Sequence, residues 1–91
     1  MPNTRSAAKR VRVTARRTLR NRMVKSRMKT AIRRFQEALA GGDQGAANEA
    51  FRKAVSQIDR AAAKGVIHRN EASRRKARLA ARLNAPAGAA D

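Results

Sequence analysis

The sequence has no cysteine, tryptophan or tyrosine, one histidine (His68) and two phenylalanines among its 91 residues. Without cysteine, disulfides, thiolate metal sites and cysteine nucleophiles are excluded. A metal site or a nucleophile–base pair built on His68 would lack the partner residues that such chemistry needs. We therefore expect no catalytic residue, no metal site, no cofactor and no small-molecule substrate.

Long apolar runs are also missing. No segment approaches the roughly 20 apolar residues of a membrane-spanning helix, and there is no signal-peptide core. We therefore expect no membrane partner. The arginine-rich, acid-free start resembles an organellar transit peptide, but its basic character continues into a segment with an apolar stripe, so no cleavage point is evident.

Acidic residues are scarce. The chain has 23 Lys and Arg against six Asp and Glu, a formal net charge of +17, which indicates a polyanionic partner. Seventeen of the bases are Arg, whose planar fork can grip phosphate with two hydrogen bonds. A genome rich in G and C would favour Arg codons equally well, so this preference supports the interpretation only weakly.

The bases are unevenly distributed along the chain. Residues 1–34 hold thirteen bases and no acid, residues 35–63 hold three bases and four acids, and residues 64–85 hold seven bases and one acid. A charge that served only solubility would be spread more evenly. This layout predicts a shaped binding surface made from two basic segments around a near-neutral middle.

Large apolar residues are few. Leu, Ile, Val and Phe number 14 of 91 residues, whereas Ala alone numbers 21. So low a share of large apolar residues, combined with high net charge, is typical of disorder, but Ala is the best helix former. The composition predicts a strongly helical chain with a small core.

Glycine and proline are absent from Asn3 until Gly41, which predicts one long helix over about residues 4–40. An apolar stripe in its second half would pack on protein. In its first half, Val11, Ala15, Leu19 and Met23 step by four, with bases on every side, so this half should project. Met23 and Met28 are interpreted as core filler.

The glycine-rich stretch 41–45 predicts a turn, and Gly65 predicts a second helix end. Helices are then expected over about residues 46–63 and 70–84, followed by a disordered tail over 85–91. The predicted fold is all-α, an antiparallel three-helix bundle with a long, projecting N-terminal basic helix, forming a single domain over residues 1–84. Its core is expected to centre on Ile32, Phe35, Leu39, Phe51, Val55, Ile58, Leu79 and Leu83.

Like charges four residues apart, such as Arg12 and Arg16, oppose the projecting helix by about 1–2.5 kcal/mol in total. Cations near its N-terminus also oppose the helix dipole. Phosphates would reverse the sign of both effects. We expect the tip to be frayed when free and helical when bound.

Several strings resemble one family: residues 64–70 (KGVIHRN), residues 74–79 (RRKARL), residues 20–22 (RNR) with Lys25 and Ser26, residues 29–35 (KTAIRRF), and an opening with Asn3, Ser6, Ala7, Lys9 and Arg10. Together they are similar to the bacterial small-ribosomal-subunit protein S-twenty family, over residues 1 to about 84. Pro2, Ser73 and the tail after Asn84 depart from the usual pattern without touching the bases.

The resemblance implies a structural constituent of the cytoplasmic ribosome rather than an enzyme. Its partners would be the small ribosomal subunit and small-subunit ribosomal RNA, bound in the 5′ domain early in assembly. His68 is interpreted either as a helix-start residue or as an RNA contact. The residues expected to contact RNA are Arg5, Lys9, Arg10, Arg12, Arg16, Arg17, Arg20, Asn21, Arg22, Lys25, Ser26, Arg27, Lys29, Arg34, Lys64, His68, Arg69, Asn70, Arg74, Arg75, Lys76 and Arg78.

Two alternatives remain open. Composition alone would allow a histone-like architectural DNA-binding protein. A cationic membrane-active helix is the other, but such helices segregate their charge from a broad apolar face, whereas cations are expected all round residues 5–22. Vesicle leakage assays should therefore be negative.

Overall fold

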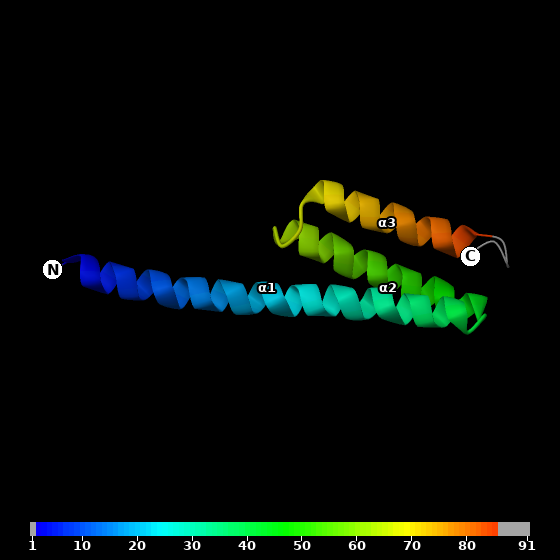
Figure 1. The fold of residues 1–91 in the computed structure, drawn as a ribbon, viewed down its shortest axis with the longest axis horizontal. Helices are drawn as coiled ribbons and strands as arrows, with labels where there is room; N and C mark the ends of the chain where they lie inside the picture. The colour runs from blue at the N-terminus through cyan, green and yellow to red at the C-terminus, as the bar shows by residue number, and fades with distance from the viewer. Residues whose placement is uncertain (1, 86–91) are drawn as a thin grey trace.

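The computed structural model describes residues 2–85, with side chains described from residue 5 onward. It contains three helices: α1 (Pro2–Ala40), α2 (Gln44–Ala63) and α3 (Arg69–Asn84). In Figure 1, α2 lies between α1 and α3 and runs antiparallel to both, while α1 continues well past the other two. The predicted all-helical fold with a long first helix is confirmed. Apart from Ala85, the tail predicted to be disordered lies outside the described residues.

The molecule is elongated. Its extents are 67 × 22 × 20 Å and its radius of gyration is 18.1 Å, against about 12 Å for a compact chain of this length. The cause is α1, which has 39 residues and at 1.5 Å per residue is roughly 58 Å long. One helix thus serves both the bundle and a projection beyond it.

The turn between α1 and α2 follows from its glycines and its aspartate. Gly42 has a φ of +77°, a left-handed conformation that residues with a Cβ rarely adopt, and its N–H donates to the Leu39 carbonyl at 3.1 Å. Asp43 caps α2, because its Oδ1 accepts a hydrogen bond from the Ala46 N–H at 3.1 Å. The predicted turn therefore reverses the chain within a few residues.

Gly65, with a φ of +74°, ends α2 in the same way. Its N–H donates to the Ala62 carbonyl at 3.0 Å, and the next N–H, of Val66, donates to the Ala61 carbonyl at 2.9 Å. This pair of bonds is the Schellman arrangement. It delivers Ile67, only 7% exposed, into the end of the core.

The core is built on a few large side chains and many alanines. Phe35, Met28 and Ile58 are the largest fully buried residues, and the rings of Phe35 and Phe51 pack with centroids 5.7 Å apart. Buried alanines on α2 and α3 let the helices approach closely; they are Ala47, Ala54, Ala61 and Ala72.

The predicted core is partly confirmed. Phe35, Ile58 and Leu79 are buried, and four more predicted members are half-buried against them: Ile32, Leu39, Phe51 and Leu83. Val55 is half-buried outside this cluster. Met28 is core filler as expected, but for Met23 the expectation is wrong, because that residue is 48% exposed.

Replacing Phe35 by alanine should lower the free energy of unfolding by about 3–5 kcal/mol, because it removes a fully buried ring and leaves a cavity. Leu19→Ala, at a site that is 60% exposed, is the matched control and should stay within about 0.5 kcal/mol. Urea unfolding followed by circular dichroism measures both. Equal effects in the two variants would show that the core is misplaced.

Candidate nucleic-acid interface

The arm, defined as residues 5–22 of α1, carries eight bases and no acid. Every side chain from Arg5 to Arg20 is exposed, and the first buried residue of α1 is Val24. No ion pair of the described residues involves an arm side chain. The arm therefore presents its charge to solvent without an ion-pair partner in the part of the chain that the structure describes.

The long helix aligns part of this charge into one row. Five exposed cations fall within a sector of about 40°, counted at roughly 100° per residue; they are Lys9, Arg16, Arg20, Arg27 and Arg34. This cation row is roughly 37 Å long at 1.5 Å per residue. It begins on the arm and continues alongside the bundle.

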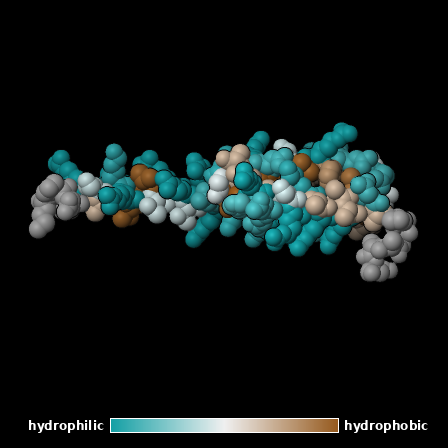
Figure 2. Space-filling view, turned by 90° about the horizontal axis from the view of Figure 1, so that it is seen from above, coloured by the Kyte–Doolittle hydropathy of each residue, from teal (hydrophilic) through white to brown (hydrophobic). Residues whose placement is uncertain are grey.

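Between residues 8 and 19 the arm carries a strip without cations, centred about 120° around the helix from the cation row. Its members, Ala8, Val11, Ala15 and Leu19, lie within about 80° of one another around the helix. All four are exposed, with Val11 at 69% and Leu19 at 60%. Apolar (brown) atoms stand among hydrophilic (teal) ones on this projection in Figure 2. Exposed Arg22 lies in the same sector about one turn beyond Leu19, so the strip is a local gap in the cations around the arm.

The predicted RNA contacts mostly lie on the surface. Of the predicted residues, Asn21, Arg75 and Lys76 are half-buried and all the others are exposed. Helix α3 also has basic side chains at its surface, where Arg69, Arg74 and Arg78 are exposed. The surface of α3 is thus a second basic face beside the docked half of α1.

Two of the residues on α3 that are predicted to contact RNA instead form ion pairs within the protein. Arg75 donates to Glu71 Oε1 from Nη2 at 2.8 Å and from Nε at 3.2 Å. The Lys76 ammonium lies 2.8 Å from Asp59 Oδ1 and joins α3 to α2. Carboxylates of the protein therefore already partly neutralise these two cations. The Lys76–Asp59 pair joins two helices, so spacing along the sequence could not reveal it.

Glu71 is the single acid of the second basic segment, and its surroundings keep it charged. The hydrogen bonds from Arg75 lower the pKa of Glu71 below its ordinary value, and the charges of Arg75, Lys25 and Arg74 lower it further. Because Lys25 belongs to α1, the field at this carboxylate comes from two helices, α1 and α3.

His68 is the N-terminal cap of α3. Its backbone is extended (φ −74°, ψ 148°), and its Nδ1 accepts a hydrogen bond from the Asn70 N–H at 3.0 Å. This contact satisfies one of the unpaired donors at a helix start. The helix-start interpretation thus has a direct structural basis, while an RNA contact from the exposed ring stays a prediction.

His68→Ala should lower the free energy of unfolding by about 1 kcal/mol, because the cap is removed. His68→Asn is the matched control, since asparagine is among the best capping residues and should retain most of the stability. Thermal unfolding measures both. An alanine variant as stable as the native chain would contradict the capping role. If His68→Asn keeps the stability but binds RNA more weakly, the His68 ring contacts RNA.

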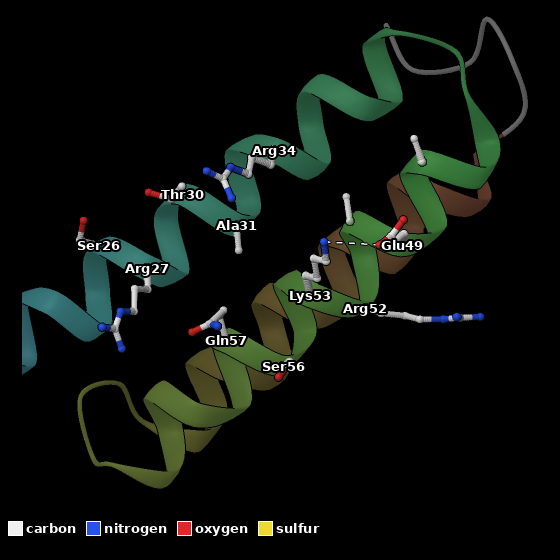
Figure 3. Close-up of a pocket in the computed structure, with 12 residues that line it drawn as sticks. Ser26, Arg27, Thr30, Ala31, Arg34, Glu49, Arg52, Lys53, Ser56 and Gln57 are labelled. Carbon is white, nitrogen blue, oxygen red and sulfur yellow. Dashed lines mark ion pairs between the residues drawn. The ribbon is translucent and has the colours of Figure 1, made fainter.

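A groove of about 690 Å³ runs between α1 and α2. Alanines on both helices leave the space, and the rim carries Arg27 and Arg34 from α1 with Arg52 and Lys53 from α2. In Figure 3, Arg27 and Gln57 point toward the space between the helices, and Lys53 turns to Glu49, 3.4 Å away. Sequence reasoning omits Arg52 and Lys53 because nearby acids balance the charge of α2.

Comparison with known proteins places this arrangement in a family. The family model of ribosomal protein S20 matches residues 2–84. The chain belongs to the ribosomal protein S20 family.

Three relatives illustrate the match, each named small ribosomal subunit protein bS20. That of Desulforamulus reducens is 52% identical over 88 residues, 97% of this chain and all of the relative. That of Caldanaerobacter subterraneus is 52% identical over 85 residues, 93% of this chain and 81% of the relative. That of Clostridium perfringens is 47% identical over 87 residues, 96% of this chain and all of the relative.

For this ribosomal protein the family implies a non-enzymatic, structural role. Over residues 2–85, no three His, Asp or Glu side chains gather as metal ligands would. None of the helices in the described part of the chain is long and apolar enough to cross a membrane. The surface of this S20 family member is instead dominated by the cation row, the α3 face and the groove.

Proposed function

We propose that this ribosomal protein is a constituent of the small subunit of the cytoplasmic ribosome that binds small-subunit ribosomal RNA directly. Residues 1–84 act as one RNA-binding domain, which contacts the 5′ domain of that RNA and stabilises its fold during assembly. The observation that carries the proposal is the arm, whose eight bases project beyond the core without a carboxylate within ion-pair distance among the described residues.

A projecting cationic rod is costly unless a polyanion meets it. Like charges four apart oppose the helix, and cations near its N-terminus oppose the helix dipole. Phosphates that line the rod make both interactions favourable and release counterions. Ribosomal RNA is a polyanion that supplies such phosphates.

The chemistry of the surface favours folded RNA over loose strands. Phe35 is fully buried and Phe51 is half-buried against it, so neither ring offers a platform on which unpaired bases could stack. Exposed Arg, Lys, Ser and Asn side chains suit phosphates and 2′-hydroxyls instead. Recognition by shape and backbone is typical of proteins that bind double-stranded RNA.

The test is chemical probing of a 5′-domain RNA transcript with and without the protein at matched salt. We expect protection of backbone positions along at least one continuous face, long enough for a rod of roughly 58 Å. Protection confined to other domains of the RNA would contradict the placement, and no protection anywhere would contradict direct binding.

A further inference from the structure

The lining of the groove between α1 and α2 has more basic side chains than acidic ones to neutralise them. The Lys53–Glu49 pair, at 3.4 Å, accounts for one base and the single acid of its lining. The remaining bases, Arg27, Arg34 and Arg52, have no carboxylate within ion-pair distance among the described residues. Two exposed guanidinium groups of α1, Arg27 and Arg34, therefore border a space that the protein itself leaves unfilled, while Arg52 stands at its α2 edge with its side chain extended away from α1 (Figure 3).

The groove also continues a surface already described. Arg27 and Arg34, which form part of its rim, are the last two members of the cation row. A polyanion bound along the cation row from the arm toward the bundle would therefore reach the groove. Its far wall is α2, the helix whose balanced charge indicates a purely structural role when the sequence is considered alone.

We propose that this groove binds the sugar–phosphate backbone of an RNA strand, so that α2 takes part in RNA recognition through Arg52 and Gln57. The inference rests on the proposed function and extends it to a helix outside the predicted contact set. Arg27 and Arg34 hold the strand from α1, Gln57 contacts it from α2, and Arg52 meets it where it leaves the groove over α2. The helix pair then encloses the strand on two sides.

The lining explains why backbone rather than bases enters. Four lining side chains donate hydrogen bonds: Gln57 points into the space between the helices, and Ser26, Thr30 and Ser56 lie along its outer rims (Figure 3). They suit phosphate oxygens and 2′-hydroxyls, whereas the lining has no aromatic ring on which a base could stack. Ala31, Ala46 and Ala50 keep the floor free of long side chains, so a sugar can approach both helices.

Two variants of α2 test the proposal against a matched control. Arg52→Ala removes a cation from the α2 edge of the groove, and Gln57→Glu places a carboxylate in the groove without changing side-chain shape. Gln44→Glu makes the same chemical change in the same helix at an exposed position outside the groove. Circular dichroism establishes that all three remain folded.

Affinity for small-subunit ribosomal RNA is measured across a salt series. Arg52→Ala and Gln57→Glu should each bind about tenfold more weakly, as for removal of one charge-assisted hydrogen bond. Arg52→Ala should also reduce the log–log salt slope by about 0.9, the value for one phosphate contact. Gln44→Glu should stay within about twofold, since it lies about 12 Å along α2 from Arg52 and its charge is screened beyond a Debye length of about 8–10 Å.

A second measurement does not depend on affinity. Because the chain has no cysteine, Ser56→Cys can carry a tethered iron chelate that cleaves nearby RNA backbone, with Asn48→Cys as the control site. We expect stronger cleavage from position 56, at nucleotides that continue the segment contacted by the arm.

The outcomes separate the two proposals. If Gln57→Glu and Gln44→Glu weaken binding equally, or neither Arg52→Ala nor the probe at position 56 has an effect, the groove does not hold RNA although the proposed function stands. If the native chain itself shows no binding to the RNA, the proposed function fails. Binding of an acidic peptide in the groove with RNA still bound elsewhere would also overturn the inference.

Discussion

Deletion of residues 1–20 should abolish tight binding to small-subunit ribosomal RNA while the bundle remains folded. The deletion removes seven bases, including the N-terminal half of the cation row. It leaves the core untouched, because every residue of the core cluster, from Val24 to Leu79, lies beyond the cut. The deletion variant therefore loses many of the cations that bind RNA but retains all the buried side chains of the core cluster.

Circular dichroism and a filter-binding assay, run on the same preparation, measure the two effects. The deletion variant should keep a cooperative unfolding transition and lose only the helical signal of the arm. Val11→Gln in the full chain, which alters the uncharged strip and keeps every base, is the control and should retain tight binding. A deletion variant without any helicity would show that the arm is needed for the fold.

The affinity of the full chain for the RNA should fall about 10³–10⁵-fold between 50 and 200 mM salt, as for a protein with 6–10 phosphate contacts. The physical reason is counterion release, since each phosphate met by an Arg or Lys frees a condensed cation. A salt titration of the dissociation constant measures this. A flat salt dependence would contradict the electrostatic account of the interface.

The arm deletion and the salt titration address the same charges independently. With seven bases removed, the deletion variant should show a much shallower salt slope for whatever binding remains. The slope should fall by about 0.9 for each phosphate that the shortened chain no longer neutralises. An unchanged slope would mean that the arm cations do not meet phosphates.

The helices can be predicted from the sequence because their signals are local. Gly42 and Gly65 end helices by adopting φ values that other residues avoid, and Asp43 starts the next one by capping it. The stripe that includes Phe35 has a helical period, which gives both the element and its buried face. The expectation that the arm frays without RNA stays a prediction.

The features that could not be predicted from the sequence depend on how the helices pack against one another. The pairing of Lys76 with Asp59 joins residues of different helices, so spacing along the chain presents this cation as a free RNA contact. The groove beside Arg52 arises because alanines of α1 and α2 face one another. Met23 falls on the helical side turned away from the bundle, although its spacing from Leu19 gives no sign of this.

The uncharged strip of the arm depends on the regularity of α1. Val11, Ala15 and Leu19 step by four, and only a helix that stays regular over this stretch keeps them on one side. Because the strip separates some apolar surface from the cations, charge distribution alone no longer excludes a membrane-active helix. A vesicle leakage assay on the full chain should still be negative, because the strip has only one Leu and one Val among its four residues.

Direct recognition of ribosomal RNA is tested by the affinities of the native chain for small-subunit ribosomal RNA and for generic duplex DNA, measured at the same salt concentration. Counterion release from a cationic rod would favour both polyanions, whereas a surface shaped for folded RNA favours only one. We predict clearly tighter binding to the ribosomal RNA at every salt concentration. Equal affinity for the DNA would contradict the account and favour an architectural DNA-binding protein.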